Sequence, residues 1–226
     1  IIMKLAILLF GMSKAENHKN SKFSSLKIDY RKSYKNYEKF IFNYFKKLGY
    51  DIDFYLATNE LSEDDKKELI ETFKPVGYKF CKTLKGNSNY EKRQVNRNEK
   101  FMKCVELCMS QKIKYDQILI TRFDLLFQRD FHKSNIKLNA LNLVSTLEKS
   151  SLICDNFYLF SAKFLSSLYN VFNKFHDNKK SFHYLLNYFR KAVGANNINF
   201  IYNERKTIEN LSFYKIHREG MPITKK

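Results

Sequence analysis

The sequence contains few glycines and prolines, and it lacks the glycine motifs of the common nucleotide-binding folds. Six glycines and two prolines occur among 226 residues. Neither G-x-G-x-x-G nor G-x-x-x-x-G-K-[ST] is present, which argues against dinucleotide oxidoreductases and P-loop NTPases. Without G-x-S-x-G, an α/β-hydrolase would have no nucleophile. No Pro-, Gly- or Ser-rich linker divides the chain, so a single domain over 1–226 is expected.

Acidic residues are outnumbered by basic ones, 23 Asp and Glu against 41 Lys and Arg, which gives a formal charge of +18. Such a charge attracts polyanions. The basic residues are scattered, however, and no zinc-finger or RNA-recognition signature accompanies them. Many of the abundant residue types also have A/T-rich codons, so part of the excess reflects genome composition. A pyrophosphate pocket explains some of the basic residues equally well, and no nucleic-acid partner is expected.

Long apolar runs are also missing, and no segment is long and apolar enough to span a bilayer. The run 5–10 is shorter than the apolar core of a signal peptide and has no small-x-small cleavage site. A cytoplasmic protein is therefore expected. The four cysteines lie on apolar faces and are expected to be buried free thiols in a reducing compartment: Cys81, Cys104, Cys108 and Cys154.

Strand and helix patterns alternate through the first 124 residues, which predicts βαβ crossovers and a mainly parallel sheet. The expected strands are 3–10, 52–57, 78–81 and 115–124. The expected helices begin at Ser33, at Ser62 and at Glu91, and the polar segment 12–32 is expected to be a loop. Later elements are a strand over 152–159, a helix capped by Ser161, a helix over 182–193, and extended segments at 199–202 and 213–216.

The stretch 115–124 is an apolar run too short for a helix, and it ends in Arg122 and Asp124. It predicts a buried strand that delivers a carboxylate to the edge of the sheet. In open α/β sheets, ligands bind outside the carboxyl ends of such strands. Asp124 therefore stands where a nucleotide or metal would bind. The alternative is an ordinary ion pair between Asp124 and Arg122.

Segments 5–11 and 115–127 together resemble the GT-A glycosyltransferases, which use a nucleotide-sugar donor. In that Rossmann-like fold a βαβ half binds the nucleotide after the first strand, and a later strand ends in an Asp-x-Asp-like motif that holds a divalent metal on the diphosphate. The form Arg122-Phe123-Asp124-Leu125 resembles the Arg-x-Asp-Leu variant of small transferases that make viral capsid glycans and bacterial surface polysaccharides. A viral protein of this kind would act in the host cytosol.

The resemblance implies a site built from several parts of the chain. Asp124 would hold Mn²⁺ or Mg²⁺, although the first acid of the motif is replaced by Arg122 or Thr121. Arg122 would point away from the site or pair with the donor phosphates. The loop at Phe10 and Gly11 would line the nucleotide crevice.

Asp155 resembles the acceptor-side element of these enzymes, where an inverting transfer needs a general base. The alternative is a turn cap before the strand. His217 is a candidate metal ligand or phosphate contact, or else a surface residue. Arg31, Arg93 and Arg97 are candidate phosphate contacts, or else solvated charges.

The sequence therefore predicts an α/β, single-domain, GT-A-like glycosyltransferase that moves a sugar, expected from a UDP-sugar, to a glycan or glycoprotein acceptor. Inversion and metal assistance are expected. Residues 3–130 would bind the nucleotide-sugar donor and residues 131–226 the acceptor. The alternatives are a metal-dependent nucleotidyl or phosphoryl transferase and a non-enzymatic polyanion-binding protein.

Overall fold

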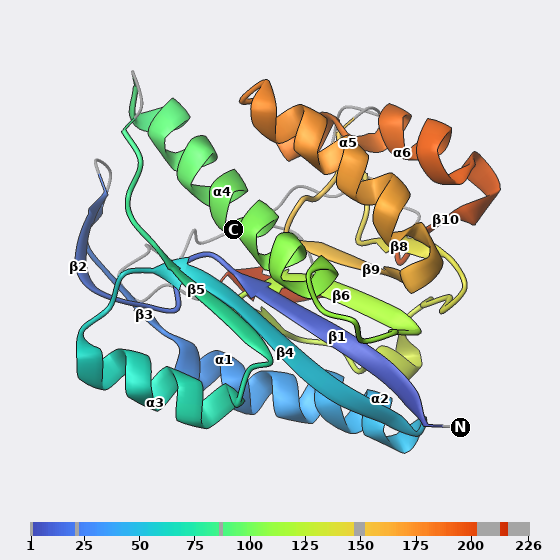
Figure 1. Ribbon diagram of the computed structural model, residues 1–226, viewed down its shortest axis with the longest axis horizontal. Helices are drawn as coiled ribbons and strands as arrows, with labels where there is room; N and C mark the ends of the chain where they lie inside the picture. The colour runs from blue at the N-terminus through green and yellow to red at the C-terminus, as the bar shows by residue number, and fades with distance from the viewer. Residues whose placement is uncertain (1, 21–22, 86–87, 147–151, 203–212, 217–226) are drawn as a thin grey trace, which may run out of the picture.

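The computed structural model describes residues 2–20, 23–85, 88–146, 152–202 and 213–216. This part of the chain forms one α/β domain around a seven-stranded sheet (Figure 1). The strands, in spatial order, are β10 (Ile198–Phe200), β8 (Leu141–Leu143), β9 (Phe157–Ser161), β6 (Gln117–Arg122), β1 (Met3–Phe10), β4 (Tyr50–Asn59) and β5 (Gly77–Cys81). β6, β1, β4 and β5 run parallel, and β9 is antiparallel to both β6 and β8. The predicted class, a single α/β domain with a mainly parallel sheet, is confirmed.

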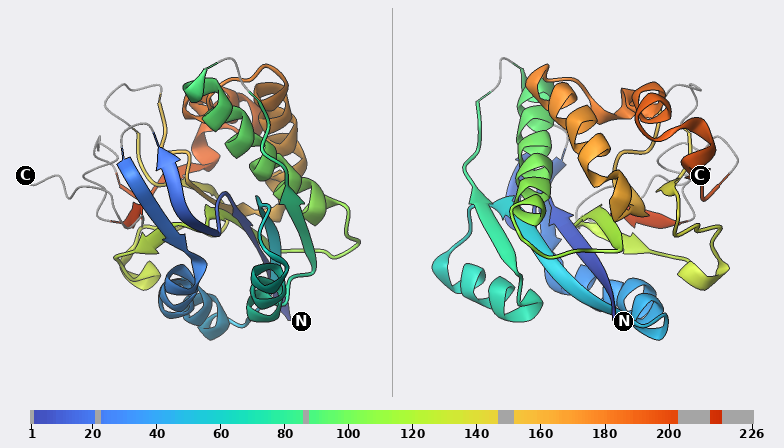
Figure 2. Two further views of the ribbon diagram at one scale, coloured as in Figure 1. Left: turned by 90° about the vertical axis from the view of Figure 1, so that its left-hand side faces the viewer. Right: turned by 45° about the vertical axis from the view of Figure 1, so that its right-hand side comes forward.

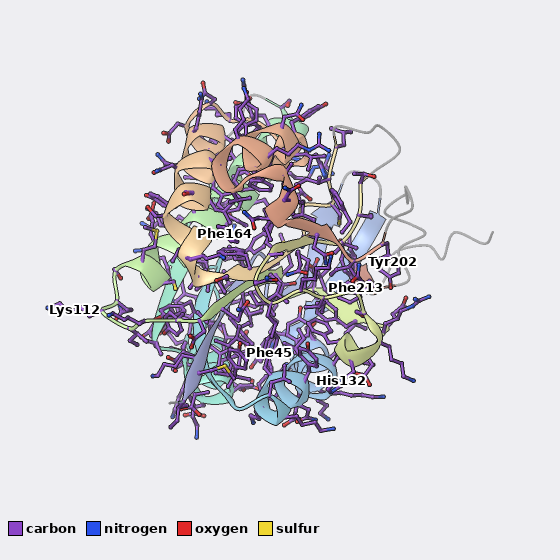
Figure 3. The ribbon with its side chains drawn as sticks, turned by 90° about the vertical axis from the view of Figure 1, so that its right-hand side faces the viewer. Phe45, Lys112, His132, Phe164, Tyr202 and Phe213 are labelled. Atoms are coloured by element: carbon purple, nitrogen blue, oxygen red, sulfur yellow. The ribbon has the colours of Figure 1, made fainter. Side chains whose placement is uncertain are left out.

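Helices cover both faces of this sheet (Figure 1). One layer contains α1 (Tyr30–Tyr37), a π-helical turn (Glu38–Phe42), α2 (Asn43–Lys47) and α3 (Glu63–Phe73). The other contains α4 (Asn89–Met109), α5 (Leu165–Asp177) and α6 (Leu186–Val193). Figure 3 labels one core aromatic in each layer, Phe45 on the α2 side and Phe164 on the α5 side.

The strand β1 joins the two cores because its side chains alternate between the faces of the sheet. Leu5, Ile7 and Leu9 pack with the α1–α3 layer, whereas Ala6, Leu8 and Phe10 pack with the α4–α6 layer. All six are fully buried. A strand buried on both faces must be apolar at every position, which is why this run is unbroken.

Of the predicted helix starts, that of α3 is confirmed and that of α4 is displaced by two residues. The Ser62 hydroxyl accepts a hydrogen bond from the Asp65 amide at 3.2 Å, and α3 follows it. α4 starts two residues before the expected Glu91, because Ser88 caps it in the same way. These hydrogen bonds satisfy amides that have no acceptor within the helix.

The expectation of a loop over 12–32 is wrong. Strands β2 (Lys14–Asn20) and β3 (Phe23–Asp29) form an antiparallel hairpin, which stands beside the carboxyl end of β1 (Figure 2). A hairpin pairs its own backbone groups and so needs no continuous apolar run, which is the signal that was sought. Helix α1 consequently begins earlier than predicted and is capped by Asp29, not by Ser33.

The second half also differs in detail from the expectation. β9 begins at Phe157 instead of residue 152. Ser161 makes no capping hydrogen bond with its side chain, and a 3-10 turn precedes α5. The helix expected over 182–193 is a 3-10 turn (Phe182–Tyr184) followed by α6. A small sheet pairs β7 (Leu125–Phe127) with β11 (Tyr214–Ile216), within the extended segment expected there.

The predicted burial of the four cysteines as free thiols is confirmed. Burial raises the pKa of the Cys108 thiol to about 12, so this group stays protonated near neutral pH.

Among the helices that the structure describes, none combines the length and the apolar character that crossing a bilayer requires.

Candidate active site at the carboxyl edge of the sheet

The carboxyl ends of three parallel strands meet at one edge of the sheet. Phe10, the last residue of β1, pairs with Ala57 of β4 and with Arg122 of β6. β9 runs the other way and starts opposite Thr121, so the residues just before β9 lie beside Arg122. The predicted candidates Phe10, Gly11, Arg122, Asp124 and Asp155 therefore belong to the same edge.

Arg122 and Asp124 form a buried, bidentate ion pair. The Arg122 Nε atom donates to Asp124 Oδ1 at 2.7 Å, and Arg122 Nη2 donates to Asp124 Oδ2. The Asp124 side chain is 3% exposed and that of Arg122 is 13% exposed. Burial opposes the charge on Arg122, but the Asp124 carboxylate outweighs it and the pKa of the guanidinium is raised. Arg122 is therefore positively charged beside the Asp124 carboxylate.

The turn that carries this pair is held by helix α1. The Tyr37 hydroxyl donates to the Arg122 carbonyl oxygen, and the Phe123 amide donates to the Phe10 carbonyl oxygen at 3.2 Å. The Asn36 side chain makes two hydrogen bonds with the Phe127 backbone, at 2.7 and 2.9 Å. Burial, and then the Asp124 charge, raise the pKa of the Tyr37 hydroxyl, so it remains a donor.

A second buried ion pair joins Arg97 of α4 to Asp155. Arg97 Nη1 donates to Asp155 Oδ2, and Arg97 Nη2 donates to the Asp155 carbonyl oxygen at 2.6 Å. The Asp155 side chain is 2% exposed and that of Arg97 is 17% exposed. The Arg97 guanidinium also lies over the Phe10 ring, 5.8 Å from its centroid. Asp155 is thus held by a side chain from another element, not only by its own turn.

Two residues of this network were missed in the sequence. Asn156 Oδ1 accepts from Arg122 Nη1 at 3.1 Å, and His183 Nε2 lies 3.5 Å from Asp155 Oδ2. Asn156 had a signal, since it directly follows a candidate acid. His183 had none, because it comes from the turn before α6. These contacts link the two arginine–aspartate pairs to each other and to the second half of the chain.

The loop after β1 is fixed against the end of β4. The Gly11 amide donates to the Ala57 carbonyl oxygen at 3.1 Å, and the Ser13 amide donates to the Thr58 hydroxyl at 3.0 Å. Gly11 has φ of +103°, a conformation that residues with a β-carbon rarely adopt. An added β-carbon would meet no atom within 4 Å, so the backbone conformation alone requires glycine here.

Of the other predicted residues, Arg31 pairs with side chains away from this network. Arg31 Nε donates to Glu68 Oε1 at 2.6 Å, and its guanidinium also pairs with Asp29, where α1 meets α3. Arg93 is exposed on α4, one turn before Arg97. His217 lies outside the described residues, so its predicted role at the site stays a prediction.

A cavity lies elsewhere in the molecule. Its volume is about 530 Å³, and it opens at the amino ends of β1 and β4 rather than at their carboxyl ends. Its lining includes Tyr34, Glu38, Phe42, Lys46 and Asp51. The charged side chains of the candidate site do not line this cavity.

Lys100 lies close to this edge and is buried without being needed for either ion pair. Its side chain is 6% exposed, and its ammonium donates to the Asn96 carbonyl oxygen of its own helix at 3.1 Å. Desolvation lowers the pKa of Lys100. The folded state therefore binds this proton less tightly than the unfolded state, and the buried charge reduces stability at neutral pH.

We expect Lys100→Met to raise the urea concentration at the midpoint of unfolding at pH 7. The gain should shrink as the pH rises toward the pKa of lysine in the unfolded chain, because the wild-type lysine then loses its charge in both states. Lys92→Met, an exposed lysine of the same helix, is the control and should change the midpoint little. A lower midpoint for Lys100→Met at pH 7 would contradict this account.

No protein-family model and no curated protein matches this chain. Among solved structures, it is similar to the galactosyltransferase LgtC in complex with donor and acceptor sugar analogs, with a TM-score of 0.43 and 10% identity. That match covers 88% of this chain and 73% of LgtC. An active-site mutant of LgtC matches with a TM-score of 0.42, 10% identity, and coverage of 88% and 72%. Similarity at this level leaves the function to be inferred from the site itself.

Proposed function

We propose that this protein is a glycosyltransferase of GT-A-like fold that takes a sugar from a nucleoside-diphosphate sugar, with UDP as the expected nucleotide. The supporting observation is the placement of two buried arginine–aspartate pairs at the carboxyl edge of β1, β4 and β6. Ligands of open α/β sheets bind at this edge. Guanidinium groups are suited to bidentate contacts with a diphosphate.

Arg97 is the residue proposed to reach the donor diphosphate. It is the more exposed of the two arginines, and its Nε atom is buried with no hydrogen-bond partner among the residues that the structure describes. Arg122, by contrast, uses Nε, Nη1 and Nη2 on Asp124 and Asn156. Binding of the donor would draw the Arg97 guanidinium from Asp155 to the diphosphate, where it neutralises the leaving group.

Asp155 is the proposed general base. The Asp155 Oδ2 atom accepts from Arg97 in the absence of donor, and the transfer of Arg97 to the diphosphate would free that oxygen to accept a proton. The acceptor oxygen would then bond to the anomeric carbon as the bond to the diphosphate breaks, and the acceptor proton would pass to Asp155. This displacement inverts the anomeric carbon. The coupling makes base activation depend on the presence of the donor.

The described residues do not fit the Mn²⁺ or Mg²⁺ expected from the sequence. Asp124, its predicted ligand, has both carboxylate oxygens engaged by Arg122. Within the described ranges, no group of three His, Cys, Asp or Glu side chains is placed to hold a metal. A metal on Asp124 would have to displace a guanidinium from a buried pair, so no step of the proposed mechanism passes through one.

The acceptor is proposed from the Arg-x-Asp-Leu resemblance of residues 122–125 alone. It is a glycan or glycoprotein of the kind built on viral capsids or in bacterial surface polysaccharides. The division into a donor half over 3–130 and an acceptor half over 131–226 is likewise a proposal. Its support is that Asp155 and His183 come from the second half, whereas Arg97, Arg122 and Asp124 come from the first.

Calorimetry with UDP tests the donor site. We expect UDP to bind the wild-type protein, and Arg97→Met to weaken that binding by about tenfold or more, because a charge-assisted contact contributes about 1.5–3 kcal/mol. Lys92→Met, an exposed residue of the same helix, should bind UDP as the wild type does. Chelation by EDTA should change the wild-type affinity less than Arg97→Met does.

The outcomes separate the alternatives. Unchanged UDP affinity in Arg97→Met would remove Arg97 from the donor site. Loss of UDP binding on chelation would restore the metal prediction. A nucleotidyl or phosphoryl transferase would prefer nucleoside triphosphates to UDP-sugars. A polyanion-binding protein would bind oligonucleotides with a steep dependence on salt and would not bind UDP.

A further inference from the structure

The turn between α5 and α6 is anchored at the candidate site from two directions. The Asn98 side chain, next to Arg97 on α4, donates to the Lys180 carbonyl oxygen at 3.1 Å. The Ile153 amide donates to the His183 carbonyl oxygen at 2.9 Å, and His183 Nδ1 lies 2.7 Å from the Ile153 carbonyl oxygen. His183 also faces Asp155. The turn is therefore held by Asn98, which follows Arg97 on α4, and by contacts to Ile153 and Asp155.

Tyr184 is exposed on this turn although its neighbours are buried. Its side chain is 58% exposed, whereas Phe182 and Leu185 on either side of it are fully buried. The Phe182 ring lies 4.9 Å from that of Phe101 and 5.6 Å from that of Phe172, which fixes the turn in the core. An exposed aromatic ring on an anchored backbone is preorganised for binding, because little entropy is lost when a ligand orders it.

A second exposed tyrosine follows four residues later. Tyr188 is 37% exposed, and its ring packs edge-on against Phe175 at 4.7 Å. Tyr184 and Tyr188 are thus two exposed aromatic side chains that follow His183 in the sequence. Aromatic rings with one face in contact with solvent and a polar hydroxyl suit ligands that are partly apolar and partly polar. A pyranose ring, with C–H groups on its faces and hydroxyls at its rim, has this character.

We propose that Tyr184 is the stacking platform for a pyranose ring of the acceptor, and that His183 holds this platform at a constant distance from Asp155. The inference rests on the proposed glycosyltransferase function and names its acceptor subsite. A pyranose stacked on Tyr184 would lie on the turn whose His183 Nε2 atom is 3.5 Å from the carboxylate proposed as the base. The specificity of the enzyme for a sugar acceptor would then come from the α5–α6 turn.

The sequence contains no tryptophan, so a single introduced tryptophan reports on this position alone. The test uses Tyr184→Trp, titrated with methyl pyranosides of glucose, galactose, mannose and N-acetylglucosamine in the presence of UDP. We expect a saturable change in tryptophan emission with at least one of these sugars. Tyr78→Trp is the matched control, since Tyr78 is 47% exposed on β5, and its emission should not respond.

A kinetic arm uses the methyl pyranoside that gives this response as the acceptor. Tyr184→Ala should raise its KM about tenfold with UDP affinity unchanged, whereas Tyr184→Phe should retain the wild-type KM because stacking needs the ring and not the hydroxyl.

The failure of this inference is distinguishable from the failure of the proposed function. If Tyr184→Trp binds UDP normally and its emission responds to no pyranoside, the proposed acceptor subsite is wrong and the proposed donor site is not contradicted. An unchanged KM in Tyr184→Ala would overturn it as well. If the wild-type protein does not bind UDP, the proposed function fails, and the pyranoside titration still decides whether Tyr184 binds sugar.

Discussion

Replacing Asp124 with asparagine is expected to lower the free energy of unfolding by about 3–5 kcal/mol, as is usual when one partner of a buried ion pair is removed. The variant leaves the Arg122 guanidinium charged and buried, with an amide where two carboxylate oxygens had accepted its hydrogen bonds. A neutral side chain cannot offset that charge. Urea denaturation at pH 7 measures the loss, and the protein should unfold at a lower urea concentration.

Two control variants test whether the loss of stability in Asp124→Asn comes from leaving the Arg122 charge without its partner. Glu106→Gln removes a carboxylate from the half-exposed Lys103–Glu106 pair of α4, and its cost should be below about 1 kcal/mol. The double variant Arg122→Met/Asp124→Leu removes both charges and should recover much of the stability lost in Asp124→Asn. A loss in Asp124→Asn as small as that in Glu106→Gln would show that Asp124 does not neutralise Arg122. In that case, Mn²⁺-dependent binding of UDP that disappears in the same variant would identify Asp124 as a metal ligand.

Asp155→Asn is expected to reduce the rate of sugar transfer by about 10²- to 10⁴-fold, equivalent to roughly 3–5 kcal/mol of activation free energy. Asparagine keeps the shape of the side chain but cannot accept the acceptor proton. Release of UDP from a panel of UDP-sugars, with methyl pyranosides as acceptors, measures the rate. UDP affinity in the same variant should fall much less than the rate, because the base acts on the acceptor and not on the diphosphate.

The buried pair with Arg97 adds a second effect that must be separated from catalysis. Asp155→Asn also leaves Arg97 without its carboxylate, so the variant will be less stable than the wild type. Rates are therefore compared at a temperature at which urea denaturation shows the variant to be folded. Asp116→Asn, an exposed aspartate that accepts from the Lys4 amide at 2.7 Å, should leave the rate unchanged. A folded Asp155→Asn protein with a near wild-type rate would exclude Asp155 as the base.

Local patterns in the sequence were sufficient to predict the first half of the sheet. Residues 5–10 are apolar at every position because both faces of β1 are buried there, and the observed strand Met3–Phe10 has the predicted bounds. Ser62 and the acidic residues after it predicted the start of α3, because a cap acts within one turn of the chain. The predicted position of Arg122 at a strand end followed from the same reasoning and is confirmed by its pairing with Phe10.

Long-range contacts could not be predicted from these patterns. The direction of β9 depends on its pairing with β6, about 40 residues earlier, and an antiparallel strand carries the same apolar residues as a parallel one. The hairpin of β2 and β3 satisfies its own backbone hydrogen bonds, so its polar sequence resembled a loop. His183 reaches Asp155 only because the α5–α6 turn packs on Phe101 and Ile153.

By itself, the sequence determined the α/β class, the ends of the early strands and the presence of acids at the sheet edge, because each depends on hydrophobic period or on a cap a few residues away. The tertiary structure alone decided what those acids contact. Asp124 meets the guanidinium of Arg122, and Asp155 meets that of Arg97, 58 residues earlier in the chain. The chemistry of a carboxylate depends on the charges within a few ångströms of it, and those neighbours are brought together only by folding.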